Sequence, residues 1–333
     1  MTTVHKFGGA PLTCHAWSGD KKQIAVSHNN KDVVLYKAGP GGKGWDKTSV
    51  LDQHDLRVTG IDWAPKTNRI VTCSSDRNAY VWVKDEESVW RHKLVVLRIN
   101  RAATCVRWSP EENKFAAGSG AKMICVCYYD EEYDWWAAKH IKKPLKSTVT
   151  TVDWHPNNVL LAAGSTDFKM RVFSGYIKEI EGKPSATQWG AKMTFGNLMA
   201  EYANSLNGGG WVHAVSFSSD GSKVAWVGHD ASVNVVEAGK GDKVSRLLTS
   251  HLPLLSIVWI SPVSFLAAGH NYVPMVFHVG GDGTIKEGGK LEEEKKAEVG
   301  QMSNARRMFQ NMDVLGQTQA VGTKITTTHE NQV

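Results

Sequence analysis

Two short segments combine residue types that could support chemistry. Residues 38–45, Ala-Gly-Pro-Gly-Gly-Lys-Gly-Trp, have the glycine content of a phosphate-binding loop. That motif requires a glycine five positions before its Gly-Lys pair and a Ser or Thr after it, but Lys37 and Gly44 occupy these positions. The segment also connects two expected strands instead of opening a helix. We therefore predict that it binds no phosphate.

The second segment contains Cys125 and Cys127. Alternate residues of a strand lie on one face, so these two thiols could reach one metal ion. A structural zinc site takes four ligands, and the sequence offers no matching second pair. We expect these cysteines to pack within a strand. The five cysteines are odd in number and spread along the chain, which is not a disulfide framework.

No nucleophile, histidine and acid can be assembled into a catalytic set from their spacing. We therefore predict no enzyme, no cofactor and no metal. Apolar residues make up 41% of the chain, which is enough for a sizeable core. The net charge of +6 over 333 residues is small for phosphate-driven binding, so we expect no nucleic-acid partner.

The sequence contains no clear signal peptide and no clear membrane-spanning segment. The N-terminus lacks the apolar core of a signal peptide. The most apolar stretch, residues 252–269, is interrupted by Pro and Ser and resembles two strands rather than a membrane span. We expect a cytoplasmic protein that does not insert into a membrane.

An internal repeat runs along most of the chain. Six segments each carry an aromatic anchor, and successive anchors are 46, 45, 46, 63 and 42 residues apart. The anchors are Trp17, Trp63, Trp108, Trp154, Phe217 and Trp259. A second aromatic series has the same period and comprises Trp45, Trp90 and Trp136. Two interleaved series with one period are not expected by chance, so the repeat is a structural unit.

Each repeat contains the same order of strands and turns. An alternating strand ends at the anchor, a second strand is rich in Ala, Val and Ile, and a turn with Asp or Asn leads into a third strand. The second aromatic series marks a fourth strand. Four short strands per repeat match the blade of a WD40 β-propeller. Since one blade cannot bury both faces, we expect the blades to stack radially, with the anchor wedged between neighbours.

The predicted fold class is therefore all-β, a WD40 β-propeller in which six blades are essentially complete and a seventh is truncated. Residues 1–283 are expected to form blades one to six, with residues 4–7 supplying a strand to the closing blade. Residues 284–328 form an insert after the sixth blade. Residues 329–333 resemble the start of a seventh repeat, which would be truncated. The alternative is a six-bladed ring with a tail.

The second repeat contains the fullest set of polar WD-repeat residues. These residues are His54, Ser74, Asp76 and Trp82. Their types match the His–Ser/Thr–Asp–Trp hydrogen-bond chain of WD repeats. A buried Asp needs such partners, because an unpaired buried charge is very costly. We expect these residues to be structural and not catalytic.

Two segments interrupt the repeat. Residues 174–210 lengthen one spacing to 63 residues and form either a lid over the propeller or a plain long loop. Residues 284–328 contain a predicted amphipathic helix near 302–312. This helix either packs on its own propeller or binds a partner's groove. Its candidate contact residues are Met302, Arg306, Arg307, Met308, Phe309 and Met312.

Several segments are more specific than a general WD pattern. They include HDLRVTGIDWAPKTNRIVTCSSDRNAYVW, TVDWHPNNVLLAAGSTDFKMRVFSGYIKEIEGKP, WGAKMTFGNLM and NARRMFQNMD. On these segments the chain resembles the family of subunit 1 of the actin-related protein 2/3 complex, a WD-repeat subunit. The resemblance extends over essentially the whole chain. The family has seven blades, and this chain differs by ending where the seventh should begin.

The resemblance implies a non-catalytic scaffold in a complex that nucleates branched actin filaments. The implied partners are the other subunits of the complex, the mother actin filament and the acidic tails of nucleation-promoting factors. Contact with the filament would be made by the helix near 302–312, with Phe309 as the best anchor. The implied location is the actin cytoskeleton.

A basic run is a candidate for the acidic tails on charge alone, and a solvated loop is the alternative. It comprises Lys139, Lys142, Lys143 and Lys146. A second function remains open, that of a generic WD-repeat adaptor such as a ubiquitin-ligase substrate receptor. The partners that co-purify with the chain would distinguish the two functions.

Overall fold

The computed structural model describes residues 7, 10–39, 41, 44–205, 209–241 and 243–291. All the secondary-structure elements named in these residues are β-strands. The strands form six four-stranded antiparallel sheets. Each sheet is made from four strands that are consecutive in sequence. The predicted all-β class and the four-stranded repeat are confirmed.

The sheets are numbered as blades one to six in chain order. The strands of blades one to three are β1 (Cys14–Trp17), β2 (Gln23–Ser27), β3 (Val33–Ala38), β4 (Trp45–Leu51), β5 (Val58–Trp63), β6 (Ile70–Ser74), β7 (Asn78–Lys84), β8 (Trp90–Val96), β9 (Ala103–Trp108), β10 (Lys114–Ser119), β11 (Met123–Asp130) and β12 (Trp135–Ile141). The strands of blades four to six are β13 (Val149–Trp154), β14 (Leu160–Ser165), β15 (Lys169–Ser174), β16 (Leu198–Ala203), β17 (Val212–Phe217), β18 (Lys223–Gly228), β19 (Ser232–Glu237), β20 (Val244–Leu248), β21 (Leu254–Ser261), β22 (Ser264–Gly269), β23 (Met275–Val279) and β24 (Ile285–Lys290).

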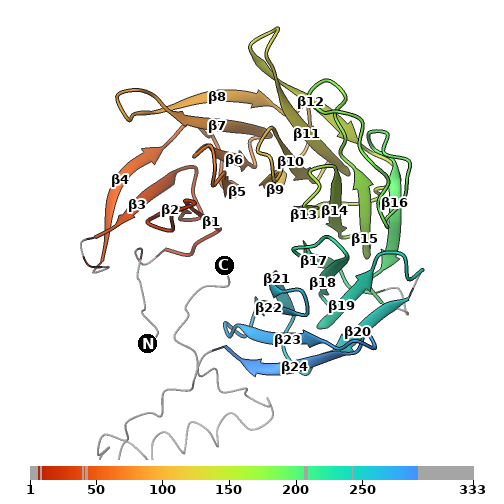
Figure 1. Ribbon diagram of the computed structural model, residues 1–333. Coiled ribbons are helices and arrows are strands. Elements are labelled where there is room, and N and C mark those ends of the chain that lie inside the picture. Colours follow the sequence, from red (N-terminus) through yellow and green to blue (C-terminus); the bar gives the residue numbers. More distant parts are fainter. Residues whose placement is uncertain are drawn as a thin grey trace, which may run out of the picture.

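The blades are arranged around a central axis as in a propeller (Figure 1). The first strand of each blade lies nearest the axis and the fourth lies at the rim (Figure 1). The first strands of successive blades are neighbours, from β1 beside β5 to β17 beside β21. The ring formed by the described residues is open between blade one and blade six (Figure 1).

Burial within a blade follows the position of the strand. The second strands β10 and β14 are buried at every residue, because each has a strand on both edges and a blade on both faces. Both contain the sequence Ala-Ala-Gly-Ser, whose small residues let neighbouring sheets approach closely. In the rim strand β8 only one residue is buried. The blades therefore stack through their inner strands, as predicted.

The aromatic anchors pack against the preceding blade. Trp63, Trp108, Trp154 and Phe217 are all buried, and each belongs to a core cluster that includes residues of the blade before it. Trp259 is partly buried against blade five, and Trp17 is partly buried. The predicted wedge between blades is thus confirmed for the anchors of blades two to five.

One predicted boundary is wrong. The sequence places the end of the propeller at residue 283, but β24 runs from Ile285 to Lys290 and pairs with β23 as the rim strand of blade six. The charged sequence of this segment suggests a solvated insert, yet a rim strand tolerates Lys and Glu because most of its side chains are exposed. The predicted helix at 302–312, the seventh-repeat start at 329–333 and residues 4–6 lie outside the described residues.

Candidate partner-binding surfaces

The polar residues of blade two form a continuous hydrogen-bond chain. The His54 Nδ1 donates to Asp76 Oδ2 at 2.7 Å, and His54 Nε2 lies 2.9 Å from Thr72 Oγ1. The Trp82 indole donates to the same Thr72 hydroxyl at 3.0 Å. A carboxylate only accepts hydrogen bonds, so the facing His54 Nδ1 is the donor, and Nε2 of the neutral ring accepts the Thr72 proton.

Ser74 is the hydroxyl of this chain in the sequence-based prediction, and that prediction is wrong. The Ser74 hydroxyl instead donates to the Leu56 carbonyl at 2.8 Å and accepts the Asp76 backbone N–H at 3.1 Å. Residues 72 and 74 are two positions apart on one strand, so both side chains point to the same face. Only the tertiary structure shows that Thr72, and not Ser74, lies between His54 and Trp82.

The hydrogen bonds of His54 and Asp76 connect separate segments of the chain. His54 is almost fully buried, and burial lowers its pKa below the usual histidine value, although Asp76 acts in the opposite direction. Asp76 also accepts the backbone N–H groups of Asp55 and Asn78. These contacts hold the loop that enters blade two against the turn between β6 and β7. That these residues are structural and not catalytic stays a prediction.

A second set of polar contacts joins neighbouring blades. Four threonine hydroxyls donate to a carbonyl at the start of the next blade, at distances of 2.5–3.2 Å. The donors are Thr13, Thr59, Thr104 and Thr150, and the acceptors are the carbonyls of Val58, Ala103, Val149 and Val212. None of these contacts was predicted, although each threonine stands four residues before an anchor tryptophan, which is a signal in the sequence. In blades five and six the same position is occupied by His213 and Leu255.

Basic side chains gather on one face of the ring, which we call the entry face. In each blade the start of the first strand and the end of the second strand lie side by side, because the two strands are antiparallel. In blade two, Val58 at the start of β5 pairs with Ser74 at the end of β6. The entry face is therefore made of the loops that enter each blade and the turns between second and third strands. Around blades two to four these segments are residues 52–57, 75–77, 97–102, 120–122, 142–148 and 166–168.

Exposed cations outnumber exposed acids on this part of the entry face. The exposed cations are Arg57, Arg77, Arg98, Arg101, Lys122, Lys142, Lys143 and Lys146. The exposed acids on the same loops are Asp52 and Asp55. Asp167 is engaged by the buried Arg171 at 2.9 Å. The first five cations were not predicted, because they are scattered in sequence and become a group only when the repeats are aligned at their anchors.

The four lysines of the predicted basic run lie in two different places in the structure. Lys142, Lys143 and Lys146 lie on the entry face, in the loop between β12 and β13. Lys139 belongs to the rim strand β12 and forms an ion pair with Glu179 at 2.7 Å. The hydrogen bond from Lys139 lowers the pKa of Glu179. Lys139 is thus committed to a partner within the chain and is not part of the basic surface.

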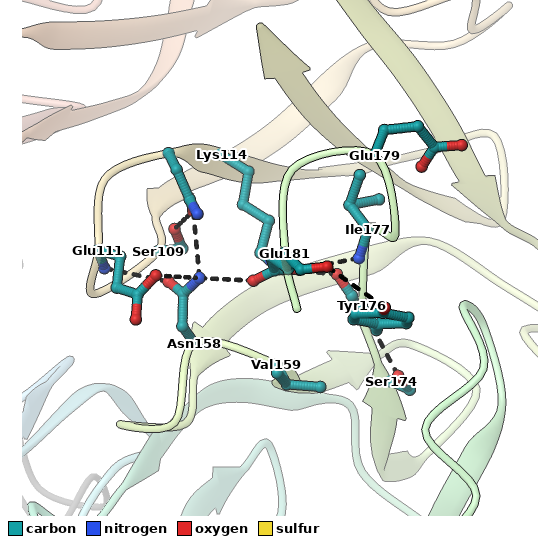
Figure 2. Close-up of polar contacts among 12 residues, drawn as sticks. Ser109, Glu111, Lys114, Asn158, Val159, Ser174, Tyr176, Ile177, Glu179 and Glu181 are labelled. Carbon is teal, nitrogen blue, oxygen red and sulfur yellow. Dashed lines mark hydrogen bonds and ion pairs between the residues drawn. The ribbon is translucent and has the colours of Figure 1, made fainter. Parts of the chain in front are cut away.

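The long segment between β15 and β16 packs against the propeller on the opposite face. Its Trp189 is buried, donates to the Gly221 carbonyl at 2.9 Å and contacts Phe217 edge-on. Its Glu181 accepts hydrogen bonds from Lys114 at 2.5 Å and from the Ile177 backbone at 2.8 Å (Figure 2). This segment therefore packs on the turns of blades three to five, and the residues that follow it form the rim strand β16.

The cysteines are core residues. Cys125 and Cys127 are buried in one hydrophobic cluster, as expected for side chains on one strand face. Burial raises the pKa of Cys125 to about 12, so its thiol stays protonated at neutral pH. Among the described residues no group of three or more His, Cys, Asp or Glu side chains could hold a metal ion. No helix in that part of the chain is long and apolar enough to cross a membrane.

Similarity to known proteins agrees with this architecture. A family model described as "WD domain, G-beta repeat" matches residues 45–83 and 139–174. The fold and these matches define a WD-repeat propeller.

Relatives with the same repeat extend over nearly the whole chain. "Actin-related protein 2/3 complex subunit 1A-B" of Xenopus laevis is 53% identical over 331 residues, which cover 99% of this chain and 88% of the relative. "Actin-related protein 2/3 complex subunit 1" of Schizosaccharomyces pombe is 41% identical over 96% of this chain and 88% of its own length. An Arabidopsis thaliana relative, subunit 1A, is 44% identical over 83% of this chain and 72% of its own length. The chain belongs to the family of actin-related protein 2/3 complex subunit 1.

Proposed function

We propose that this chain is a non-catalytic scaffold subunit of an actin-related protein 2/3 complex, in which it supports actin filament nucleation and branching. The observation that carries the proposal is the similarity to subunit 1 proteins over 331 residues, 99% of the chain. The structure supports it, since the polar networks described above join blades and loops to each other. A propeller of this kind offers two broad faces and a rim to companion subunits in the cytoplasm.

Co-purification tests the scaffold role. The tagged chain should recover actin-related subunits from a cell extract in amounts near one per chain, as determined by quantitative mass spectrometry. Recovery of cullin adaptors in place of actin-related subunits would show that the chain is instead a substrate receptor of a ubiquitin ligase. An unrelated WD-repeat propeller of similar charge is the matched control.

The acidic tails of nucleation-promoting factors are proposed to bind the basic part of the entry face. The exposed Lys142, Lys143 and Lys146 lie beside the cations of blades two and three, so a negatively charged segment can contact several loops at once. Such exposed contacts act mainly through long-range attraction and weaken with salt.

Charge reversal on this loop tests the role. Replacing Lys142, Lys143 and Lys146 by Glu should weaken tail binding at least about tenfold in roughly 50 mM salt and less in roughly 300 mM salt, because salt screens exposed charges. The same charge change at the exposed residues Lys21, Lys22 and Lys47 of blade one is the control. Equal losses in the two variants would contradict a specific role for the entry face.

Contact with the mother filament is proposed for the 302–312 segment, on the basis of sequence alone. Met308 and Phe309 supply apolar area, and burial of one Phe contributes about 1.5–3 kcal/mol. Met308→Ala with Phe309→Ala should leave the propeller folded and reduce branch formation by the reconstituted complex. Branch density is counted by fluorescence microscopy, and an unchanged density would show that this segment does not bind the filament.

A further inference from the structure

A cavity of about 440 Å³ lies on the face opposite the entry face. It opens between the turn after β9, the turn after β13 and the long loop that follows β15. Its lining includes Glu111, Asn158, Glu181, Ser185 and Thr187. Neither the structural hydrogen bonds of the WD repeat nor the proposed contacts with acidic tails and filament use this cavity.

One wall of the cavity is held by a buried ion pair. Lys114 is fully buried, and its ammonium group donates to Glu181 Oε2 at 2.5 Å and to the Gly175 carbonyl at 3.0 Å (Figure 2). Burial lowers the pKa of Lys114, while the contact with Glu181 opposes that shift. Since Glu181 also accepts the Ile177 backbone N–H, the loop is fixed at its start and forms a rigid rim.

On the second wall, three acceptor atoms surround one donor group, the side-chain amide of Asn158. The buried side-chain amide of Asn158 lies 2.7 Å from Glu181 Oε1, 3.1 Å from Asn113 Oδ1 and 3.4 Å from Glu111 Oε2 (Figure 2). An amide nitrogen has only two protons, so three acceptors compete for them. Glu111 is the most distant of the three and receives the weakest contact.

The charge of Glu111 is also not neutralised by an ion pair. Within the described ranges, none of the salt bridges includes Glu111, and Lys114 is committed to Glu181. Glu111 is exposed on the cavity side of its turn, where its carboxylate can accept further hydrogen bonds. The lining therefore contains one carboxylate, that of Glu111, that forms no ion pair among the described residues, on a protein whose overall charge is positive.

We propose that this cavity binds an arginine side chain of a partner polypeptide. A guanidinium group is planar, always charged and offers five N–H donors, and it binds carboxylates through two parallel hydrogen bonds. Glu111 supplies the carboxylate, and the hydroxyl of Ser185 in the lining supplies a further acceptor. The site lies opposite the basic entry face, so it takes a cationic segment where the entry face takes an anionic one.

The test uses N-acetyl-arginine amide and its uncharged isostere N-acetyl-citrulline amide. Both are titrated into the full chain, and amide chemical shifts of residues 180–187 are followed by transverse-relaxation-optimised NMR. The arginine compound should give saturable shifts, and the citrulline compound should bind at least about tenfold more weakly, because it lacks the charge that pairs with a carboxylate. Equal binding of both compounds, or no saturable shift with either, would overturn the proposal without recourse to any variant.

Glu111→Gln locates the site. This change removes the charge but keeps the shape, and it should weaken binding of the arginine compound at least about tenfold. Glu131→Gln, on the exposed turn between β11 and β12, should leave binding unchanged. Wild-type affinity in Glu111→Gln would show that the compound binds elsewhere. Failure of the chain to co-purify with actin-related subunits would not affect these titrations, so the two proposals are tested separately.

Discussion

Blade two and blade six contain the same repeat, but their inner strands meet different surroundings. In β5 every residue is buried or half-buried, since blade three covers its outer face. In β21 exposed residues alternate along the strand, and Val258 and Ile260 are more than half exposed. The equivalent positions in blade two are Asp62 and Ala64. Burial of an inner strand is thus a property of the neighbouring blade rather than of the strand's own sequence.

The polar contacts differ in the same way. Thr59 of blade two donates to the Ala103 carbonyl of blade three, whereas Leu255 occupies this position in blade six. His54 at the entry to blade two is buried against Asp76, whereas His251 at the entry to blade six pairs with Glu287 at a partly exposed site. Blade two has buried polar contacts with the blade after it, whereas blade six packs against blade five and donates one hydrogen bond to it, from the Trp259 indole to the Ser216 carbonyl.

The anchor tryptophans should show the largest difference between the two blades. Trp63→Ala leaves a cavity between blades one and two and should lower the free energy of unfolding by about 3–5 kcal/mol. Trp259→Ala should cost less, because Trp259 is only partly buried. Urea unfolding followed by circular dichroism measures both. Equal losses would mean that Trp259 packs against blade five as tightly as Trp63 packs against blade one.

The entry histidines should show the next largest difference. His54→Ala removes one of the hydrogen-bond donors to the buried Asp76, which keeps the backbone N–H groups of Asp55 and Asn78, and should cost about 2 kcal/mol. His251→Ala removes a partly exposed pair and should cost less than about 1 kcal/mol. The same urea experiment applies, and a cost for His251→Ala that matches His54→Ala would refute this contrast.

The threonine contacts between blades should have a smaller effect. Thr59→Val keeps the shape but loses the hydrogen bond to Ala103, which should cost about 1 kcal/mol. Leu255→Thr places a threonine in blade six, where no described blade follows, and should not stabilise the protein. A gain in stability from Leu255→Thr would show that a carbonyl acceptor is in fact available there.

The smallest effect on stability near neutral pH is expected at His213, because this residue should affect stability only in acid. Burial and the neighbouring imidazoles of His229 and His270 lower the pKa of His213 from 6.5 to about 4. The folded state therefore binds fewer protons than the unfolded state, so the stability contributed by this group is full above about pH 6.5 and falls as the pH drops toward 4. His213→Thr, which introduces the residue of blades one to four, should reduce this acid loss and change little near neutral pH. Parallel pH profiles of the melting temperature for the variant and the wild type would test this.

Much of the fold could be predicted because it follows from local patterns. The two aromatic series predicted the first and fourth strands of the repeats, and alternation of apolar residues predicted which strand faces lie inside. The boundary at residue 283 failed, because a rim strand with the sequence Ile-Lys-Glu-Gly-Gly-Lys has the composition of a loop. Its pairing with β23 is what makes it a strand.

The candidate surfaces could be predicted only in part. The sequence indicated Lys142, Lys143 and Lys146 as an exposed basic group, but it could not show that Lys139 is paired with Glu179, 40 residues away. It also contained no local sign that the isolated arginines of blades two and three lie on the same face. Strand direction decides that arrangement, since all the entry loops meet at one end of the blades.

The sequence by itself determined the period, the strand order and the aromatic anchors, because these depend on residues of the same or the next repeat. Only the tertiary structure decided that Thr72 and not Ser74 links His54 to Trp82. It also decided that Lys114 neutralises Glu181 and leaves Glu111 outside the ion pair. In each case two side chains of similar type, Thr72 and Ser74 or Glu181 and Glu111, cannot be distinguished from the sequence pattern. They differ only in how closely the folded blades bring them to a partner, and hydrogen-bond and ion-pair energies fall with that distance.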